Sequence, residues 1–156
     1  TTRMSSGMPD LTGLSISDVA TATNVTLAAD TISVVNYTGA AAATMTLPAA
    51  TAGTIVIYCQ SKDTTGGTAT LVFDAAGSDV WATGSVIESR ASSEVTFDTS
   101  AAGETKLTFT PANAATNLLT TGGQIAFICY EDATWHIATK LAAETTQVTG
   151  AFVFAA

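Results

Sequence analysis

Charged side chains are scarce in this sequence. Asp, Glu, Lys and Arg together make up 12% of its 156 residues, about half of the share typical of soluble domains. The polar surface therefore has to come from Thr, Ser, Asn and Gln. A neutral coat rich in β-branched threonine favours strands, and it suits an assembly protein better than a freely diffusing enzyme.

Basic residues are the scarcer of the two charged kinds. Five Lys and Arg stand against thirteen Asp and Glu, for a net charge of −8, and the five are scattered along the chain. Nucleic-acid binding needs clustered Lys and Arg that displace counterions from phosphates. We therefore expect no nucleic-acid partner, and in a nucleic-acid container this protein is expected on the outside.

Long apolar runs and helical patterns are also missing. No stretch of 18 or more apolar residues is present, so no membrane-spanning helix and no membrane partner are expected. The first residues lack the apolar core of a signal peptide, which predicts a chain made and used without secretion. No window has the i, i+3, i+4, i+7 apolar spacing of an amphipathic helix over ten or more residues.

What the sequence does contain is a series of short β-branched and aromatic runs with turn residues between them. These runs predict about nine or ten strands, and Glu131–Ala133 reads as the turn of a hairpin. The predicted fold class is all-β, an antiparallel β-sandwich or jelly-roll-like barrel, with residues 26–156 as a single domain. The expected strands lie at 31–35, 44–47, 54–59, 68–73, 80–81, 93–97, 106–110, 124–130, 134–138 and 152–154.

Two of these runs resemble each other. Both Gly53–Cys59 and Gly123–Cys129 read Gly-polar-Ile-apolar-apolar-apolar-Cys, and both are apolar on two faces, as central strands are. We expect these two strands in the middle of the core. Period-two alternation predicts that Ile55, Ile57 and Cys59 share one face and that Ile125, Phe127 and Cys129 take the corresponding face.

The first 25 residues are rich in Ser, Thr and Gly, and Gly7, Pro9 and Gly13 would break a helix there. We predict an extended N-terminal arm over 1–25. Short apolar anchors on such an arm either dock on a neighbouring subunit or pack on the arm's own domain, and both alternatives stay open. The candidate partner-binding residues of the arm are Met4, Met8, Leu11, Leu14 and Ile16.

The sequence carries no recognisable catalytic motif. Its one histidine, His136, lies in a predicted strand without a nucleophile elbow, so we expect a structural or surface role, no catalytic residues and no cofactor. Cys59 and Cys129 fit no zinc or CxxC spacing; they are interpreted as buried free thiols, with a disulfide across adjacent strands as the alternative and reactive chemistry as the least favoured use.

Other chemistry-bearing residues also have two interpretations each. Trp81 and Trp135 are either core or interface anchors, the preferred interpretation, or a sugar-stacking platform. Asp74 and Asp79 would be able to hold calcium together with loop carbonyls, but their spacing matches no known loop pattern. No metal site is therefore predicted.

Three segments together resemble virion proteins of tailed phages. Thr44-Met-Thr-Leu-Pro-Ala-Ala-Thr-Ala-Gly53 before an apolar strand is similar to the TLPAATAG run common in those proteins. The strand Gly-Gln-Ile-Ala-Phe-Ile with its turn and Trp135-His-Ile is similar too, and the loop from Phe73 to Gly84 resembles their Asp- and Gly-rich linkers. The likeness spans residues 30–140.

The resemblance implies a capsid decoration (cement) protein or a related head or tail fibre β-domain. Such proteins are β-rich, usually trimeric, and lie outside the capsid across capsomer junctions. The implied function is non-enzymatic: bridging neighbouring major capsid subunits from the virion exterior, after assembly in the host cytoplasm. The main alternative is a fibre or adhesin domain that binds a host receptor. A Thr-rich ice-binding protein and a small hydrolase are weaker alternatives, because neither the fixed Thr period nor the nucleophile–base set is present.

Overall fold

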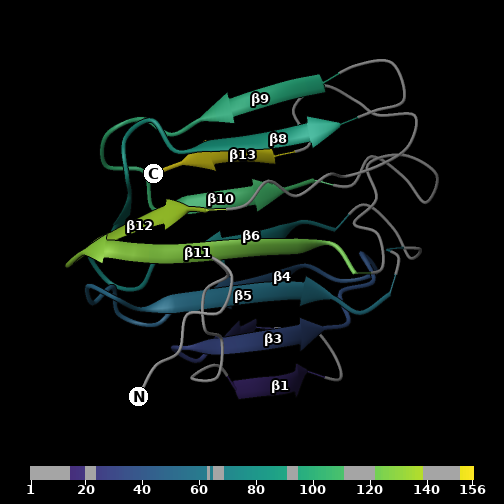
Figure 1. The fold of residues 1–156 in the computed structure, drawn as a ribbon. Coiled ribbons are helices and arrows are strands. Elements are labelled where there is room, and N and C mark those ends of the chain that lie inside the picture. The colour runs from purple at the N-terminus through teal and green to yellow at the C-terminus, as the bar shows by residue number, and fades with distance from the viewer. Residues whose placement is uncertain are drawn as a thin grey trace, which may run out of the picture.

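All the regular secondary structure in the described part of the chain is β-strand (Figure 1). The computed structural model describes residues 15–19, 24–62, 64, 69–90, 95–110, 122–138 and 152–156. The all-β prediction is thus confirmed. The strands are β1 (Ser15–Val19), β2 (Asn24–Thr26), β3 (Thr31–Val35), β4 (Ala43–Thr46), β5 (Ile55–Gln60), β6 (Leu71–Asp74), β7 (Val80–Trp81), β8 (Val86–Arg90), β9 (Val95–Thr99), β10 (Lys106–Phe109), β11 (Gln124–Glu131), β12 (Thr134–Ile137) and β13 (Phe152–Ala155).

Two sheets lie face to face and form a sandwich. A six-stranded sheet has the order β1-β3-β5-β11-β12-β7, and a five-stranded sheet behind it in Figure 1 has the order β13-β10-β6-β4-β2. Strands β8 and β9 form a separate ribbon, which is tied to the five-stranded sheet because the Phe154 amide donates to an Asp98 carboxylate oxygen at 2.6 Å. Short turns after apolar runs thus build two layers that bury their facing sides against each other.

The first six strands alternate between the two sheets. Strands β1, β3 and β5 enter the six-stranded sheet and pair in parallel, with Ser15 beside Thr31 and Thr31 beside Val56. Strands β2, β4 and β6 do the same in the other sheet. Each strand is followed by a strand in the other sheet. When the chain comes back to a sheet, its next strand runs parallel to the strand it left there. We call this arrangement the two-sheet winding.

Parallel pairing in the winding corrects one part of the sequence prediction. The strands were expected to be antiparallel throughout, but both sheets are mixed: β1-β3-β5 and β2-β4-β6 are parallel, whereas β5-β11, β11-β12, β6-β10 and β10-β13 are antiparallel. Short turns commonly join antiparallel neighbours within one sheet. In this protein they cross from one sheet to the other, and no described feature confirms a jelly-roll arrangement.

Aromatic rings fill the space between the sheets. Tyr58 on β5 meets Phe73 on β6 edge to face at 5.0 Å between centroids, and Phe73 contacts Phe127 on β11 at 5.3 Å. Trp81 packs on Phe127 at 5.5 Å and on Phe154 at 5.9 Å. These contacts join both sheets into one core. The structure therefore uses Trp81 and Trp135, both buried, as core anchors, which was the preferred prediction.

The two resembling strands do lie at the centre, as expected, because β5 and β11 are the middle pair of the six-stranded sheet. Each predicted set of three shares a face, but the prediction that the two sets take corresponding faces is wrong, because they lie on opposite sides of the sheet. Val56, Tyr58 and Gln60 point inward and are fully buried, whereas Ile55, Ile57 and Cys59 are half-buried on the outside. The strands run antiparallel, so Gly53 meets Cys129 instead of Gly123, with its amide donating to the Cys129 carbonyl at 2.8 Å.

Candidate functional site

The part of the predicted arm that the structure describes is built into the sheet of its own domain. Residues 15–19 form β1, which pairs with β3, and the Ser15 amide donates to the Asp30 carbonyl at 3.1 Å. The Ser15 and Thr31 hydroxyls lie 2.9 Å apart. Of the candidate anchors, Ile16 is in this strand with 75% of its surface exposed. Met4, Met8, Leu11 and Leu14 lie outside the described residues.

Ile16 belongs to an apolar surface on the outer side of the six-stranded sheet. On β3 the usual pattern is inverted: Thr31 and Ser33 are buried toward the core, while Ile32 and Val34 face outward. Register aligns the outward side chains into rows across the strands, because Cα partners share a face. We call this surface the outer face; its members are Ile16, Ile32, Val34, Ile55, Ile57, Cys59, Ala126 and Ile128.

One apolar row crosses four strands, whereas the neighbouring row across the same strands begins at Asp18 and ends at Gln124. Ile16 is the Cα partner of Ile32, Ile32 of Ile57, and Ile57 of Ala126. Parallel strands are usually covered and apolar on both faces, and β1, β3 and β5 in this row follow that pattern. Ile16 is the exposed member of this row, Ile32 and Ile57 are half-buried and Ala126 is buried, so the exposed apolar area, the kind that marks contact surfaces, lies at the β1 end. The outer face is therefore the first candidate for a functional surface.

The two cysteines lie on opposite sides of the same sheet. Cys59 is half-buried on the outer face and its cross-strand partner is Gln124, whereas Cys129 is buried in the core. Both are free thiols, so the disulfide alternative does not hold. Burial raises the pKa of the Cys129 thiol, and its Sγ donates to the Glu131 carbonyl at 2.9 Å. This environment keeps the thiol protonated and unreactive.

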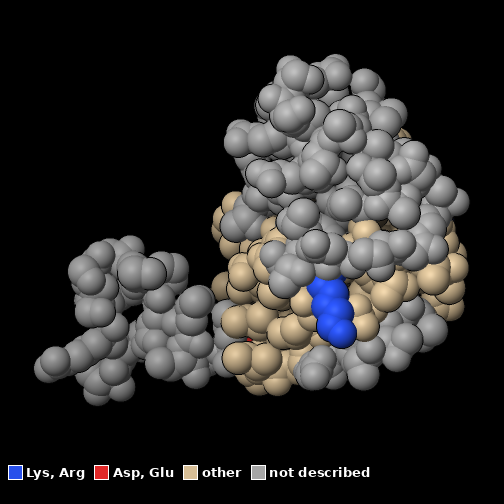
Figure 2. Space-filling view, turned by 90° about the vertical axis from the view of Figure 1, so that its right-hand side faces the viewer, with Lys and Arg blue, Asp and Glu red and all other residues tan. Residues whose placement is uncertain are grey.

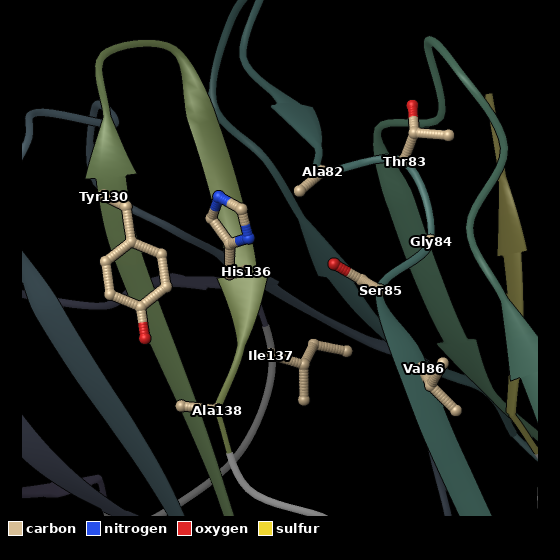
Figure 3. Close-up of a pocket in the computed structure, with 9 residues that line it drawn as sticks. All are labelled: Ala82, Thr83, Gly84, Ser85, Val86, Tyr130, His136, Ile137 and Ala138. Carbon is tan, nitrogen blue, oxygen red and sulfur yellow. The ribbon is translucent and has the colours of Figure 1, made fainter.

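A pocket of about 360 Å³ is the second candidate site (Figure 3). One wall is residues 82–85, which join β7 to β8, together with Val86 at the start of β8; the other is residues 136–138, at the end of β12, with Tyr130 of β11 beside them. The pocket exists because β7 is only two residues long and pairs with Thr134 and Trp135 alone. After Trp81 the chain leaves the edge of β12. The part of β12 beyond Trp135 therefore faces the turn of residues 82–85 across the pocket.

The turn on one side of the pocket is held by a buried serine. The Ser100 hydroxyl donates to the Ala82 carbonyl at 2.6 Å, and its oxygen accepts the Ser85 amide at 3.0 Å. The Gly84 amide donates to the Ser100 carbonyl at 2.9 Å, and Gly84 has a φ of +84°, which suits glycine. These bonds fix the wall in place without any ligand.

Aromatic side chains form the opposite wall. Tyr130 and His136 come from adjacent strands, and their rings meet edge to face at 4.9 Å between centroids (Figure 3). The His136 Nε2 atom is buried and has no hydrogen-bond partner. The same holds for the Nε1 atoms of Trp81 and Trp135. Most buried polar atoms have partners, so His136 is a polar group with bonding capacity left over.

The pocket does not assemble a hydrolase triad. Among the described residues, no hydrogen bond joins Ser85 to His136, and none of the nine residues lining the pocket is a carboxylate. A triad requires a nucleophile, a base and an orienting acid in contact. The arrangement present is suited to binding a molecule through hydroxyl, imidazole and aromatic groups.

Asp79 has a structural partner. Its Oδ2 accepts the Ala50 amide at 2.6 Å, which ties the loop before β7 to the loop after β4. The described residues include no group of three or more His, Cys, Asp or Glu arranged to hold a metal ion. They also include no helix long and apolar enough to cross a membrane.

Comparison with known proteins finds no family model, no curated protein and no solved structure that matches this chain.

Proposed function

We propose that this protein is a non-enzymatic virion structural protein that binds the outer surface of a phage capsid and bridges neighbouring major capsid subunits. The observation that carries the proposal is the outer face, which ends in the 75% exposed side chain of Ile16. An exposed apolar side chain at the end of a half-buried apolar, strand-built surface suits docking on another protein. The resemblance of residues 30–140 to phage virion proteins supplies the identity of the partner.

The neutral surface is consistent with this role. Charged residues are 12% of the sequence, and in Figure 2, which views an edge of the sandwich, uncharged atoms surround a small blue patch in the described part. Few charges have to lose their water when such a surface is buried, and desolvating charges is what makes polar interfaces costly. The net charge of −8 disfavours contact with packaged nucleic acid, which favours the capsid exterior.

Stabilisation of the capsid would follow from mass action and repetition. A protein that binds only the assembled shell lowers the free energy of that shell relative to its dissociated parts. Many weak contacts on one particle, or three on a homotrimer, add avidity without a strong single contact. The proposed protein therefore needs a modest apolar surface and no chemistry.

Ile16→Asp tests the proposal. The side chain is exposed, so the variant should fold, while a carboxylate within an apolar interface should weaken capsid binding about tenfold or more. Val153→Asp is the matched control: Val153 is 45% exposed on β13, an edge strand of the other sheet. Binding is measured by co-sedimentation with capsids that lack the protein.

Wild type and Val153→Asp should saturate the capsids and raise the temperature at which particles open, and Ile16→Asp should do neither at the same concentration. Equal binding by all three chains would remove the outer face from the interface. Failure of the wild type to bind any capsid would overturn the proposed function itself.

The alternative function is a fibre or adhesin domain that binds a host receptor. The pocket beside Tyr130 and His136 favours it, because a preformed concave site has no use in simple shell bridging. Sedimentation of the wild-type chain with host cells, and not with capsids, would select this alternative.

A further inference from the structure

We propose that the pocket between β12 and the β7–β8 turn binds a neutral polyhydroxylated ligand, a sugar ring of a glycan. This inference depends on the pocket alone and does not require capsid binding. The pocket volume of about 360 Å³ lies at the lower end of the range for ligand sites, roughly 300–1,000 Å³. That size fits a small ring better than a peptide or a nucleotide.

The polar groups of the pocket are of the kind that hydroxyl groups bind. Thr83 and Ser85 on one wall, and Tyr130 and His136 on the other, each carry a side chain that donates or accepts hydrogen bonds (Figure 3). None of the nine lining residues is an Asp, Glu, Lys or Arg, so the pocket offers no carboxylate, ammonium or guanidinium partner to a charged ligand. A ligand with many neutral hydroxyls matches this set.

The apolar groups of the pocket match the C–H face of a sugar ring. Four large hydrophobic side chains are exposed among the described residues, and two of them, Val86 at 37% and Tyr130 at 67%, line this pocket. Exposed aromatic rings beside polar groups provide an apolar surface with a polar rim. The C–H face of a sugar would pack on Tyr130 while its hydroxyls bond to the walls.

Preorganisation strengthens the case. Ser100 fixes the 82–85 turn through bonds to Ala82 and Ser85, and the β11–β12 hairpin fixes Tyr130 relative to His136. A site whose walls are already held loses little freedom when a ligand enters. The net charge of −8 further disfavours acidic sugars through long-range repulsion.

The test uses the wild-type chain and three neutral sugars, glucose, galactose and N-acetylglucosamine, with N-acetylneuraminic acid as the charged comparison. Binding is followed by saturation-transfer NMR and by amide shifts, at sugar concentrations up to about 10 mM. We expect at least one neutral sugar to bind saturably and to shift the amides of residues 82–86 and 136–138. The acidic sugar should bind more weakly.

Three variants locate the site. Tyr130→Ala should weaken the binding about tenfold, whereas Tyr130→Phe keeps the ring and should stay within about threefold. Val153→Ala truncates an exposed residue on the other sheet and should leave binding unchanged. Native thermal melting of each variant confirms that the fold is intact.

Three results would overturn the inference: no saturable binding of a neutral sugar, binding that Tyr130→Ala does not weaken, or tighter binding of the acidic sugar. Because the measurement contains no capsid, its failure leaves the capsid-binding proposal to its own sedimentation test.

Discussion

At the scale of single residues, Gln60 is the most constrained polar side chain in the described core. It is fully buried, its Nε2 donates to the Tyr37 carbonyl at 2.7 Å and also to the Lys62 carbonyl, and its Oε1 accepts the Tyr58 hydroxyl. A buried glutamine with its bonding groups in use joins the end of β5 to the loop after β3 and to the residues that follow β5. Removing it leaves several buried polar groups unpaired, which is costly.

Gln60→Leu should therefore lower the free energy of unfolding by about 2 to 4 kcal/mol, measured by urea denaturation. Gln124→Leu is its control, because Gln124 is an exposed glutamine on the neighbouring strand β11 and should change stability by less than about 0.5 kcal/mol. Equal effects of the two substitutions would mean that the hydrogen bonds of Gln60 contribute nothing beyond its shape.

Two buried tyrosines should make the fold sensitive to alkali. Burial raises the pKa of Tyr37 to about 12 and raises the pKa of Tyr58 as well, whereas tyrosines of the unfolded chain ionise near about 10. Below that value both states are neutral and the stability is fully present. Above it only the unfolded state ionises, so the free energy of unfolding falls as the pH rises toward about 12.

Urea denaturation at several values between about pH 8 and pH 11.5 measures this fall. Tyr37→Phe removes one of the two groups and should make the alkaline slope shallower, although it also lowers stability at neutral pH because the Tyr37 hydroxyl donates to the Ala69 carbonyl. Identical slopes for both chains would contradict a buried, neutral Tyr37.

At the scale of elements, the turns show where the backbone is strained. Ala133, in the β11–β12 turn, has a φ of +64°, a region that costs a residue with a Cβ about 1–2 kcal/mol. Asp30, before β3, has a φ of +52°, but its carboxylate oxygen accepts the Ile55 amide at 3.1 Å. Both residues have a positive φ, but only the Asp30 side chain makes a hydrogen bond that offsets the strain.

Ala133→Gly should raise the free energy of unfolding by about 0.5–1 kcal/mol, after allowing for the extra freedom of glycine in the unfolded chain. Asp30→Gly should lower it, because the bond to Ile55 is lost. Thermal and urea denaturation of both variants measure the signs. A destabilised Ala133→Gly chain would show that the turn is not strained.

Strand positions could be predicted from the sequence, whereas strand partners could not. Thr31–Val35 and Val80–Trp81 coincide with β3 and β7 as predicted, because β-branched runs ending at turn residues mark strands locally. The parallel pairs could not be found that way, since pairing depends on which sheet each turn leads to. One signal was available: Ile16-Ser17 with Val19 recurs as Ile32-Ser33 with Val35, and the register aligns them.

Short or weakly apolar strands were missed for the same local reason. β1, β2 and β8 have few large apolar residues, and their positions depend on neighbouring strands. The pocket was also not predictable, because Tyr130, His136 and the 82–85 turn meet only when β7 ends early beside β12. The histidine was identified, but its surroundings come from distant parts of the chain.

At the scale of the whole molecule, each sheet of the sandwich contains strands from both halves of the chain. The two-sheet winding of β1 to β6 has β5 and β6 as its last strands, and each is covered by a strand from the second half: β11 pairs with β5, and β10 with β6. β13 then closes on β10. Neither half contains a finished sheet of this sandwich.

This dependence has a consequence for synthesis. While the ribosome makes residues 75–123, the winding carries an unpaired backbone edge on β5, and β11 covers that edge only after residues 124–131 have emerged. At about 5–20 residues per second, the nascent chain exposes this edge for several seconds. Open strand edges pair with other chains, so crowded polysomes producing this protein should be its main opportunity to aggregate.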